Sequence, residues 1–407
     1  MPTLSPLRRR SASVMIAGTM LIGGCTTAAE DPTDVAVASP TDGAAAAPSQ
    51  APESADPTES ASAAPEPSPT GPAPGGVYAG PVSQHLDARV AHLPHRVYVP
   101  NETSNDVAVI DPETFEVVGR FNAGLAPEHI SPDWDFSKLY VSNMNGATLT
   151  VIDPETQQPI DTMEVPFPYN VFFTPDGSKA IIVADYLGAD MVADNGLYFY
   201  DRETWELLEF VQVPYPGVNH LDFTADGRYL MVTCESSGAV VKIDTVEMEV
   251  VGVVIVGGSP LDIRLDPGGE VFYVANQGTH GVDIIDAEAM EAVGFIPAAT
   301  GAHAFAFSRD ATRLFLTNRL ENTIDVIDLA TRTIVDSWPA GGSPDMATVS
   351  PDGTQLWISN RFHGTVNVFD PETGEILATI ETGGNPHGLT YWPQPGTISL
   401  GHNGNMR

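Results

Sequence analysis

A pair of short phrases recurs seven times along this chain, and this repetition constrains its fold more than any other feature. The first phrase is an apolar run that usually ends in Asn or Asp, as in Tyr140-Val141-Ser142-Asn143. The second phrase follows about ten residues later and ends in aspartate, as in Val151-Ile152-Asp153. The copies of the first phrase are Tyr98–Asn101, Tyr140–Asn143, Ile182–Asp185, Met231–Cys234, Tyr273–Asn276, Phe315–Asn318 and Trp357–Asn360.

The spacing of the second phrase indicates the architecture that the repeats build. Its terminal aspartates are separated by 42, 48, 43, 42, 42 and 42 residues. They are Asp111, Asp153, Asp201, Asp244, Asp286, Asp328 and Asp370. A period of about 40 residues, made of short β-branched and aromatic runs with turn residues between them, is typical of a propeller blade rather than a helical solenoid. The sequence therefore predicts an all-β fold, a seven-bladed β-propeller.

Each repeat is expected to form four antiparallel strands, which make one blade. In the last repeat these strands fall at 346–349, 356–360, 365–370 and 375–381. Asp-Gly pairs at 176–177, 226–227 and 352–353 favour tight hairpins, because Gly accepts a positive φ. The first repeat lacks an inner strand and the chain ends with a surplus one at 387–392. We predict that the surplus strand pairs with the first repeat and closes the ring.

The amino-terminal residues indicate export. Three arginines precede an apolar run at 14–22 that is too short to span a bilayer as a mature helix, and small residues then lead to Cys25. We expect residues 1–25 to be a lipoprotein signal peptide whose lipobox ends at Cys25, the lipidated residue. The alternatives are an ordinary secretory signal or an uncleaved anchor.

The segment after Cys25 is predicted to be a tether. Residues 26–76 are rich in Ala, Pro, Ser and acidic residues and contain no Lys or Arg, so they cannot bury enough apolar surface to offset the entropy of ordering. We therefore expect a disordered tether at 26–76, the propeller at 77–393 and a polar tail at 394–407.

Charge and cysteine content exclude several classes of function. The formal net charge is −35, and residues 77–407 hold 45 of the 53 acidic residues but only 15 basic ones. So negative a field argues against nucleic acid and against adsorption to anionic lipid head groups. Once Cys25 carries the lipid, Cys234 is the only cysteine left, so no internal disulfide can form, and no Cys-x-x-Cys-His haem motif is present. We expect Cys234 to be a small buried residue.

The repeat phrases resemble a known family. The Tyr-Val-x-Asn phrase, the Val-Ile-Asp-Pro-Glu-Thr phrase at 109–114 and 151–156, and the Ser-Pro-Asp-Gly turn at 350–353 are similar to YVTN-type β-propeller repeats of bacterial surface and periplasmic proteins. The resemblance covers residues 95–393 and extends more distantly to the propellers of cytochrome d1, amine dehydrogenase heavy chains and lactonases. The signal, tether and composition resemble those of actinobacterial surface lipoproteins. The resemblance implies the fold, but propellers host many unrelated functions.

One polar residue precedes or begins each predicted inner strand, and together these residues form the candidate ligand-binding site. Inner strands line the central channel, so we expect the side chains to converge on one mouth of it. The candidates are His129, Asn170, His220, Asp262, His303, Asp345 and His387. Such imidazoles and carboxylates could hold a small polar ligand or a divalent metal such as Zn or Cu. The metal candidates are His220, His303, His387 and Asp345. The alternative is structural, with each histidine bonded to a carbonyl of the next blade.

Two further segments carry polar groups. An insertion at 185–196 contains three Asp and one Asn and could hold Ca²⁺, although its spacing better fits a solvated surface insertion. The tail at 394–407 is expected either to fray or to fold back over the channel mouth near His387, where Arg407 would pair with the acidic rim.

Compact catalytic motifs are absent from the sequence: it has no Gly-x-Ser-x-Gly, no Gly-rich phosphate loop and no His-Glu-x-x-His. We therefore expect a ligand-binding or protein-interaction module rather than an enzyme. It would be a monomer, anchored by its lipid at the outer face of a bacterial cytoplasmic membrane. Its partners would be the membrane, through that anchor, and an exported protein or a small polar ligand. The alternative is a lactonase-like, metal-assisted hydrolase, because propeller active sites are assembled from separate blades.

Overall fold

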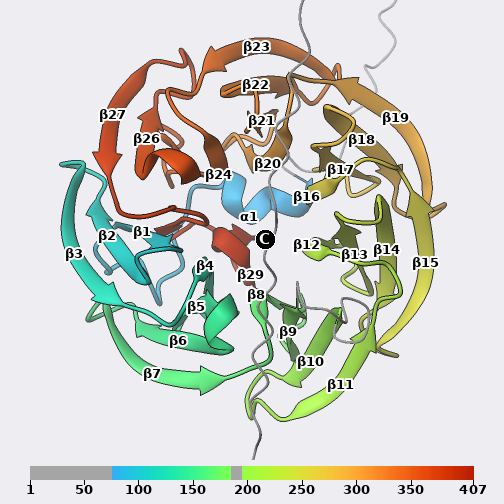
Figure 1. Cartoon of the computed structure of the whole chain (residues 1–407), viewed down its shortest axis with the longest axis horizontal. Coiled ribbons are helices and arrows are strands. Elements are labelled where there is room, and N and C mark those ends of the chain that lie inside the picture. The colour runs from blue at the N-terminus through green and yellow to red at the C-terminus, as the bar shows by residue number, and fades with distance from the viewer. Residues whose placement is uncertain (1–75, 185–194) are drawn as a thin grey trace, which may run out of the picture. The chain divides into compact units, whose positions relative to one another are not determined.

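The computed structural model describes residues 76–184 and 195–407. Seven β-sheets surround a central channel, which confirms the predicted seven-bladed β-propeller (Figure 1). Cys25 with its predicted signal, the predicted tether up to residue 75, and most of the insertion, at 185–194, lie outside the described residues.

The two strands of each blade nearest the channel are almost completely buried, because the neighbouring blades cover both of their faces. The inner strands are β4 (Pro127–Pro132), β8 (Pro168–Phe173), β12 (Val218–Phe223), β16 (Pro260–Leu265), β20 (Ala302–Phe307), β24 (Pro344–Val349) and β28 (Thr390–Trp392). The second strands, which end within or at the recurring first phrase, are β1 (Arg96–Asn101), β5 (Leu139–Asn143), β9 (Lys179–Ala184), β13 (Tyr229–Cys234), β17 (Val271–Asn276), β21 (Arg313–Asn318) and β25 (Leu356–Asn360).

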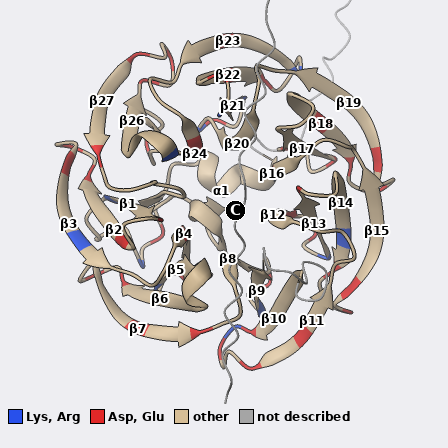
Figure 2. Cartoon of the chain, viewed as in Figure 1, with Lys and Arg blue, Asp and Glu red and all other residues tan. Residues whose placement is uncertain are grey.

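The two outer strands of each blade become progressively more exposed. The third strands are β2 (Asp106–Asp111), β6 (Thr148–Asp153), β10 (Gly196–Asp201), β14 (Ala239–Asp244), β18 (Gly281–Asp286), β22 (Thr323–Asp328) and β26 (Thr365–Phe369). The outermost strands are β3 (Glu116–Asn122), β7 (Gln158–Glu164), β11 (Leu207–Gln212), β15 (Glu249–Ile255), β19 (Glu291–Pro297), β23 (Thr333–Pro339) and β27 (Ile376–Glu381). Acidic residues are spread around this outer layer and its loops, with few basic ones among them (Figure 2).

The hydrophobic core is divided among the contacts between adjacent blades. Val97 and Val99 of β1, for example, pack in one buried cluster with Trp357 of β25 and Val366 of β26. Cys234 is buried in another such cluster, where burial raises the pKa of its thiol, as expected for a small structural residue. Each blade therefore depends on its two neighbours to bury its apolar faces.

The ring closes as the sequence predicts. β28 pairs antiparallel with β1, with Arg96 opposite Trp392 and Tyr98 opposite Thr390. The first blade therefore takes its inner strand from the far end of the chain, in the order β28-β1-β2-β3. This pairing removes a free sheet edge and joins the two ends of the ring.

Segments at both ends of the described chain lie near the channel axis (Figure 1). Before β1, the short helices η1 (Gly76–Tyr78) and α1 (Ala79–Val82) pack on the ring, where the Tyr78 hydroxyl donates to the Leu265 carbonyl at 3.0 Å. After β28, β29 (Ser399–Gly401), η4 (His402–Gly404) and β30 (Asn405–Met406) continue the sheet of β8.

The tail at 394–407 does not fray. It folds back close to His387, as one of the two expected arrangements has it, with Asn403 against Gly388, but Arg407 does not pair with an acidic rim. It is largely buried and lies within the ring, and the Arg407 guanidinium donates to Asp222 Oδ1 at 3.1 Å rather than pairing with an exposed rim. The side chains of Arg407 and Asp222 are at most 8% exposed. The remaining short helices, η2 (Met144–Gly146) and η3 (Arg361–His363), follow β5 and β25. None of the helices in the described ranges is long and apolar enough to cross a membrane.

Candidate functional site

An irregularity in the inner strands presents two successive residues to the channel. In the six inner strands from β4 to β24, the pairing with the second strand shifts register shortly after the first residue, as a β-bulge does. In these six strands the residue directly after the first one belongs to what we call the mouth layer, and His387, which follows the bridge residue Pro386 ahead of β28, is its seventh member. The mouth layer is Glu128, Tyr169, Asn219, Leu261, His303, Asp345 and His387. The next residue forms the lower layer: His129, Asn170, His220, Asp262, Ala304, Met346 and Gly388.

The seven sequence candidates therefore divide between two layers instead of forming one set at the mouth. His303, Asp345 and His387 belong to the mouth layer. The other four, in the lower layer, are His129, Asn170, His220 and Asp262. All seven residues are at most 2% exposed. The division arises because the position of the polar residue relative to the strand start differs by one between repeats.

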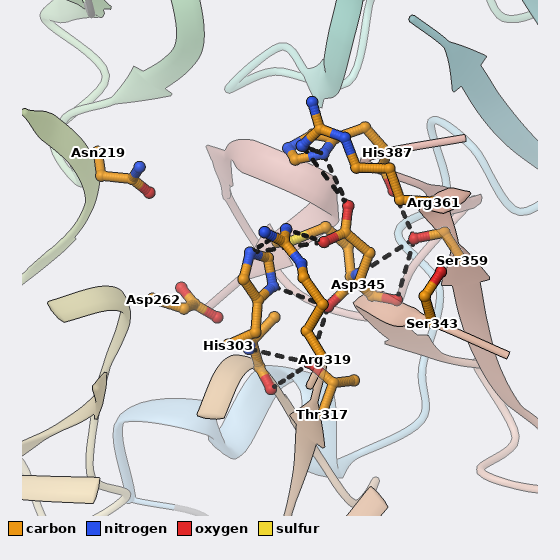
Figure 3. A network of polar contacts seen from close by, with 12 residues as sticks. Asn219, Asp262, His303, Thr317, Arg319, Ser343, Asp345, Ser359, Arg361 and His387 are labelled. Carbon is orange, nitrogen blue, oxygen red and sulfur yellow. Dashed lines mark hydrogen bonds and ion pairs between the residues drawn. The ribbon is translucent and has the colours of Figure 1, made fainter. Parts of the chain in front are cut away.

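Asp345 lies at the centre of a charged network in the mouth layer (Figure 3). Its Oδ2 is 2.7 Å from His387 Nδ1, and its Oδ1 contacts Arg319 Nη2 and lies 3.5 Å from His303 Nε2. Burial opposes ionisation, but the positive charge of Arg319, together with His387 and His303, holds the pKa of Asp345 well below its usual range. Asp345 is therefore an ionised carboxylate at neutral pH.

Arg361 links this network to the loop that follows β1. Its Nη2 donates to Glu102 Oε2 at 2.6 Å, and its Nη1 lies 2.6 Å from His387 Nδ1. Burial would lower the pKa of Arg361, but Asp345, Glu128 and Glu102 raise it, so the guanidinium keeps its charge. Arg319 and Arg361 each follow a second-strand Asn directly, and the sequence analysis did not single out that position.

The small hydroxyl residue of the first phrase holds the mouth layer in place. Thr317 Oγ1 donates to the Asp345 carbonyl at 2.8 Å, and Ser359 Oγ donates to the His387 carbonyl at 2.5 Å (Figure 3). Thr233 makes the same bond to Leu261 at 2.5 Å. In these three blades the second strand thus fixes the first channel-facing residue of the next blade.

A pocket opens above this network. It holds about 610 Å³ of empty space, which includes part of its open mouth. Its walls are formed by Glu102, Glu128, Met144, Tyr169, Asn219, Glu235, Leu261, His303, Arg319 and Arg361. Burial raises the pKa of Glu128 and Glu235, so these carboxyl groups are easier to protonate than exposed ones. Asn219 donates to Glu235 Oε2 at 3.1 Å and lies across the channel from Arg319 (Figure 3).

His303 is the histidine among the pocket-lining residues, and both of its ring nitrogens are occupied. Its Nδ1 is 3.0 Å from the Asp345 carbonyl, the bond to the next blade that the structural alternative predicts, while Nε2 contacts Arg319. Burial, reinforced by the charge of Arg319, lowers the pKa of His303 to about 3. The ring is therefore neutral and has no free lone pair.

A cluster of three histidines lies in the channel next to the mouth layer, and we call His129, His220 and His402 the histidine cluster. One ring nitrogen from each residue lies within 4.8 Å of the others. All three rings are buried, and burial lowers the pKa of each, so the rings are neutral at physiological pH. His402 comes from η4 in the tail, where no repeat phrase marks it. His402 was therefore not among the residues predicted from the sequence to form the site.

Gly388 makes room for this arrangement. A Cβ atom at this position would lie 2.6 Å from His129 Nδ1 and 2.8 Å from Asn403 Oδ1, so no side chain fits there.

The other two lower-layer candidates support the surrounding structure. Asp262 accepts the backbone N–H groups of Ile263 and Phe305, both at 2.9 Å, which joins two blades. Asn170 Oδ1 lies 2.8 Å from His402 Nδ1 and orients that ring.

Solved structures share this fold at low sequence identity. A chain of hydrazine synthase from Kuenenia stuttgartiensis superposes with a TM-score of 0.59 at 18% identity, covering 72% of this chain and 98% of that chain. The periplasmic gluconolactonase PpgL of Pseudomonas aeruginosa gives 0.62 at 19%, covering 74% and 99%. Dihydro-heme d1 dehydrogenase NirN gives 0.56 at 15%, covering 73% and 75%. At these identities the likeness concerns the fold.

No curated protein sequence matches the chain significantly. A family model, however, covers most of the ring, from the segment before β1 to the residues just after β28. Residues 81–394 match the YNCE-like beta-propeller family, and the chain belongs to that family.

Proposed function

We propose that this protein is a binding module that holds a small polar ligand in the pocket at the channel mouth. The observation that carries this proposal is a set of buried polar atoms without hydrogen-bond partners among the described residues. Arg319 Nε is an unsatisfied donor, and Asn219 Oδ1 and Glu128 Oε2 are unsatisfied acceptors. Buried polar groups of this kind are unfavourable unless something pairs with them. A ligand with both donors and acceptors would satisfy them.

The charge of the pocket favours a neutral or zwitterionic ligand. Arg361 is already paired with Glu102, and Arg319 with Asp345, so neither guanidinium contributes an unopposed positive charge. A polyanion would meet Glu128 and Glu235 in the same pocket. The paired arginines still have N–H groups for hydroxyl or carboxylate oxygens, since each guanidinium carries five donors. A hydroxyl-rich molecule, such as a polyol, a sugar or an amino acid, fits this arrangement.

Hydrolysis of a lactone-like ester is the second candidate, supported by the shared fold of the gluconolactonase. His303 would be the base within the pocket, but its two ring nitrogens are held by Asp345 and Arg319. A general base needs a lone pair within reach of the proton that it removes. This geometry favours binding over catalysis. Hydrolysis of a lactone by the wild-type protein, lost in the His303→Gln variant, would instead favour catalysis over binding.

The binding proposal is tested by a thermal-shift screen of the exported protein against polyols, sugars, sugar acids and amino acids, followed by calorimetry of the hits. We expect the screen to find a ligand that binds the Asn219→Ala and Arg319→Lys variants at least about tenfold more weakly than it binds the wild type. A tenfold loss of affinity is what the loss of one or two hydrogen bonds produces. Arg89→Lys is the matched control, because Arg89 lies before β1 and its side chain is 48% exposed. Equal affinity in all three variants would refute the proposal.

We further propose that the module is held at the outer face of the cytoplasmic membrane by a lipid on Cys25, in line with the signal at residues 1–25. The negative charge of residues 77–407 disfavours direct adsorption to anionic lipid, so attachment would depend on the lipid alone. In cells that express the full chain, Cys25→Ser should move the protein from the detergent-extracted membrane fraction to the soluble fraction. Unchanged membrane association of Cys25→Ser would contradict a lipid anchor at this residue.

A further inference from the structure

The histidine cluster is assembled from three separate parts of the chain. His129 lies on β4, His220 on β12 and His402 in η4 of the tail. The ring centroids of the three pairs are 4.6 to 5.2 Å apart. The repeat accounts for two of these histidines, but the third requires the tail to run back into the channel.

Two of the three rings are oriented by asparagine oxygens. His402 Nδ1 lies 2.8 Å from Asn170 Oδ1, and His129 Nδ1 lies 3.2 Å from Asn403 Oδ1. An amide oxygen only accepts, so each Nδ1 carries the proton and each Nε2 keeps its lone pair. Metal-bound histidines typically have this arrangement, in which the nitrogen away from the metal donates to an oxygen.

Three of the four remaining nitrogens of the cluster lack hydrogen-bond partners among the described residues. His402 Nε2 has none, and His220 has none at either Nδ1 or Nε2. Both side chains are at most 1% exposed. Buried imidazole nitrogens that only pack against other rings are unfavourable, and aromatic packing alone does not require histidine at all three positions.

A fourth imidazole adjoins the cluster. His387 Nε2 lies 3.1 Å from His129 Nε2. Two nitrogens bound tetrahedrally to one metal ion at about 2.0 Å are about 3.3 Å apart, so this spacing already suits a shared ion. The cluster nitrogens lie within 4.8 Å of one another, so a separation of that size needs to shorten by about 1.5 Å to match a tetrahedral site.

We propose that His129, His220 and His402 bind one transition-metal ion with imidazole preference, Zn²⁺ or Cu²⁺, with His387 as the neighbouring fourth nitrogen. Nitrogen donors select these ions over Mg²⁺ and Ca²⁺, which prefer oxygen. The carboxylates of Glu128 and Asp345 lie 3.5 and 2.7 Å from ring nitrogens of His387, the neighbour of the cluster, and favour a cation there. The proposal goes beyond ligand binding in the mouth pocket, because the cluster residues do not line that pocket.

The test uses the exported protein, purified without a polyhistidine tag and analysed for metals as isolated and after chelation. Chelated protein is titrated separately with Zn²⁺, Cu²⁺ and Co²⁺. We expect one ion per chain, a Co²⁺ visible spectrum typical of tetrahedral nitrogen ligands, and nitrogen hyperfine structure in the Cu²⁺ resonance spectrum. The metal found in the isolated protein distinguishes Zn²⁺ from Cu²⁺. Wild-type protein that binds none of the three ions stoichiometrically would overturn the proposal.

Variants separate this site from accidental binding at surface histidines. His220→Gln and His402→Gln should abolish stoichiometric binding, and Asn170→Ala should weaken it about 10- to 100-fold by releasing the His402 ring. His92→Gln is the control, since the side chain of His92 is 56% exposed, and it should bind as wild type. Unfolding curves of the metal-free variants show whether each one folds. Wild-type affinity in both cluster variants would refute the site, whether or not the mouth pocket binds its ligand.

Discussion

Asp345 carries a negative charge that lies close to both arginines of the channel mouth. Its carboxylate contacts Arg319 directly and lies 3.9 Å from Arg361. The rings of His387 and His303 lie 2.7 and 3.5 Å from the same carboxylate. Its side chain is completely buried, so no water screens these charges. The mouth is therefore a compact arrangement of opposite charges whose members depend on one another.

Removing this carboxylate should strongly destabilise the protein. Asp345→Ala leaves the Arg319 charge buried without its counterion, and breaking one partner of a buried pair typically costs about 3 to 5 kcal/mol. We expect a lower midpoint in urea unfolding monitored by tryptophan fluorescence. Glu203→Ala is the control, because the Glu203 side chain is 83% exposed and its pairing with Arg202 is weak. An Asp345→Ala midpoint equal to that of the control would show that the network does not contribute to stability.

At the scale of the element, the hairpins that join the inner and second strands share one side-chain hydrogen bond. A hydroxyl donates to the Oδ1 of an aspartate two residues later at 2.6 Å in four blades. The pairs are Thr174–Asp176, Thr224–Asp226, Ser308–Asp310 and Ser350–Asp352. The predicted Asp-Gly turns are confirmed, since Gly177, Gly227 and Gly353 all have φ between 71° and 77°.

This turn makes part of the stability depend on pH. The hydrogen bond from Thr224, helped by the backbone N–H of Arg228, lowers the pKa of Asp226 in the folded protein. A carboxyl whose pKa is lower when folded stabilises the fold above its unfolded pKa, and that contribution is lost as pH falls through the folded value. Asp226→Asn should therefore have a lower Tm than wild type at pH 7, and the difference should shrink in acid. A difference that stays constant from pH 7 into acid would contradict this origin.

The repeat phrases were sufficient to predict the blades, because the apolar residues of each phrase are those of a strand that is buried between two neighbouring strands. The phrases could not predict whether a channel-facing residue lies in the mouth layer or in the lower layer. The bulge presents two successive residues to the channel, and the polar residue is the first of the two in some repeats and the second in others. His129 and His303 illustrate this difference. Arg319 and Arg361 were missed because the residue after the second-strand Asn varies in chemistry from blade to blade. His402 was missed because the tail has no repeat to place it.

At the scale of the whole molecule, the end of the chain does two separate things. Residues up to Trp392 supply the inner strand of the first blade through pairing with β1. The residues that follow enter the channel, where β29 pairs with β8 and Arg407 binds the carboxylate of Asp222 and the carbonyls of Phe223 and Thr224. The first contribution closes the ring, and the second fills it.

Two truncations distinguish these contributions. Deleting 387–407 removes the closing strand and opens a sheet edge, so we expect the loss of cooperative unfolding and aggregation. Deleting 394–407 keeps β28, so the ring should still close. It should nevertheless melt at a lower temperature, because Asp222 loses its buried partner and the channel loses packed side chains. Calorimetry and size-exclusion chromatography measure both outcomes. The shorter truncation also removes His402, so it should remain folded but lose the metal binding proposed for the histidine cluster. A soluble 1–386 protein that melts cooperatively would show that closure by β28 is dispensable.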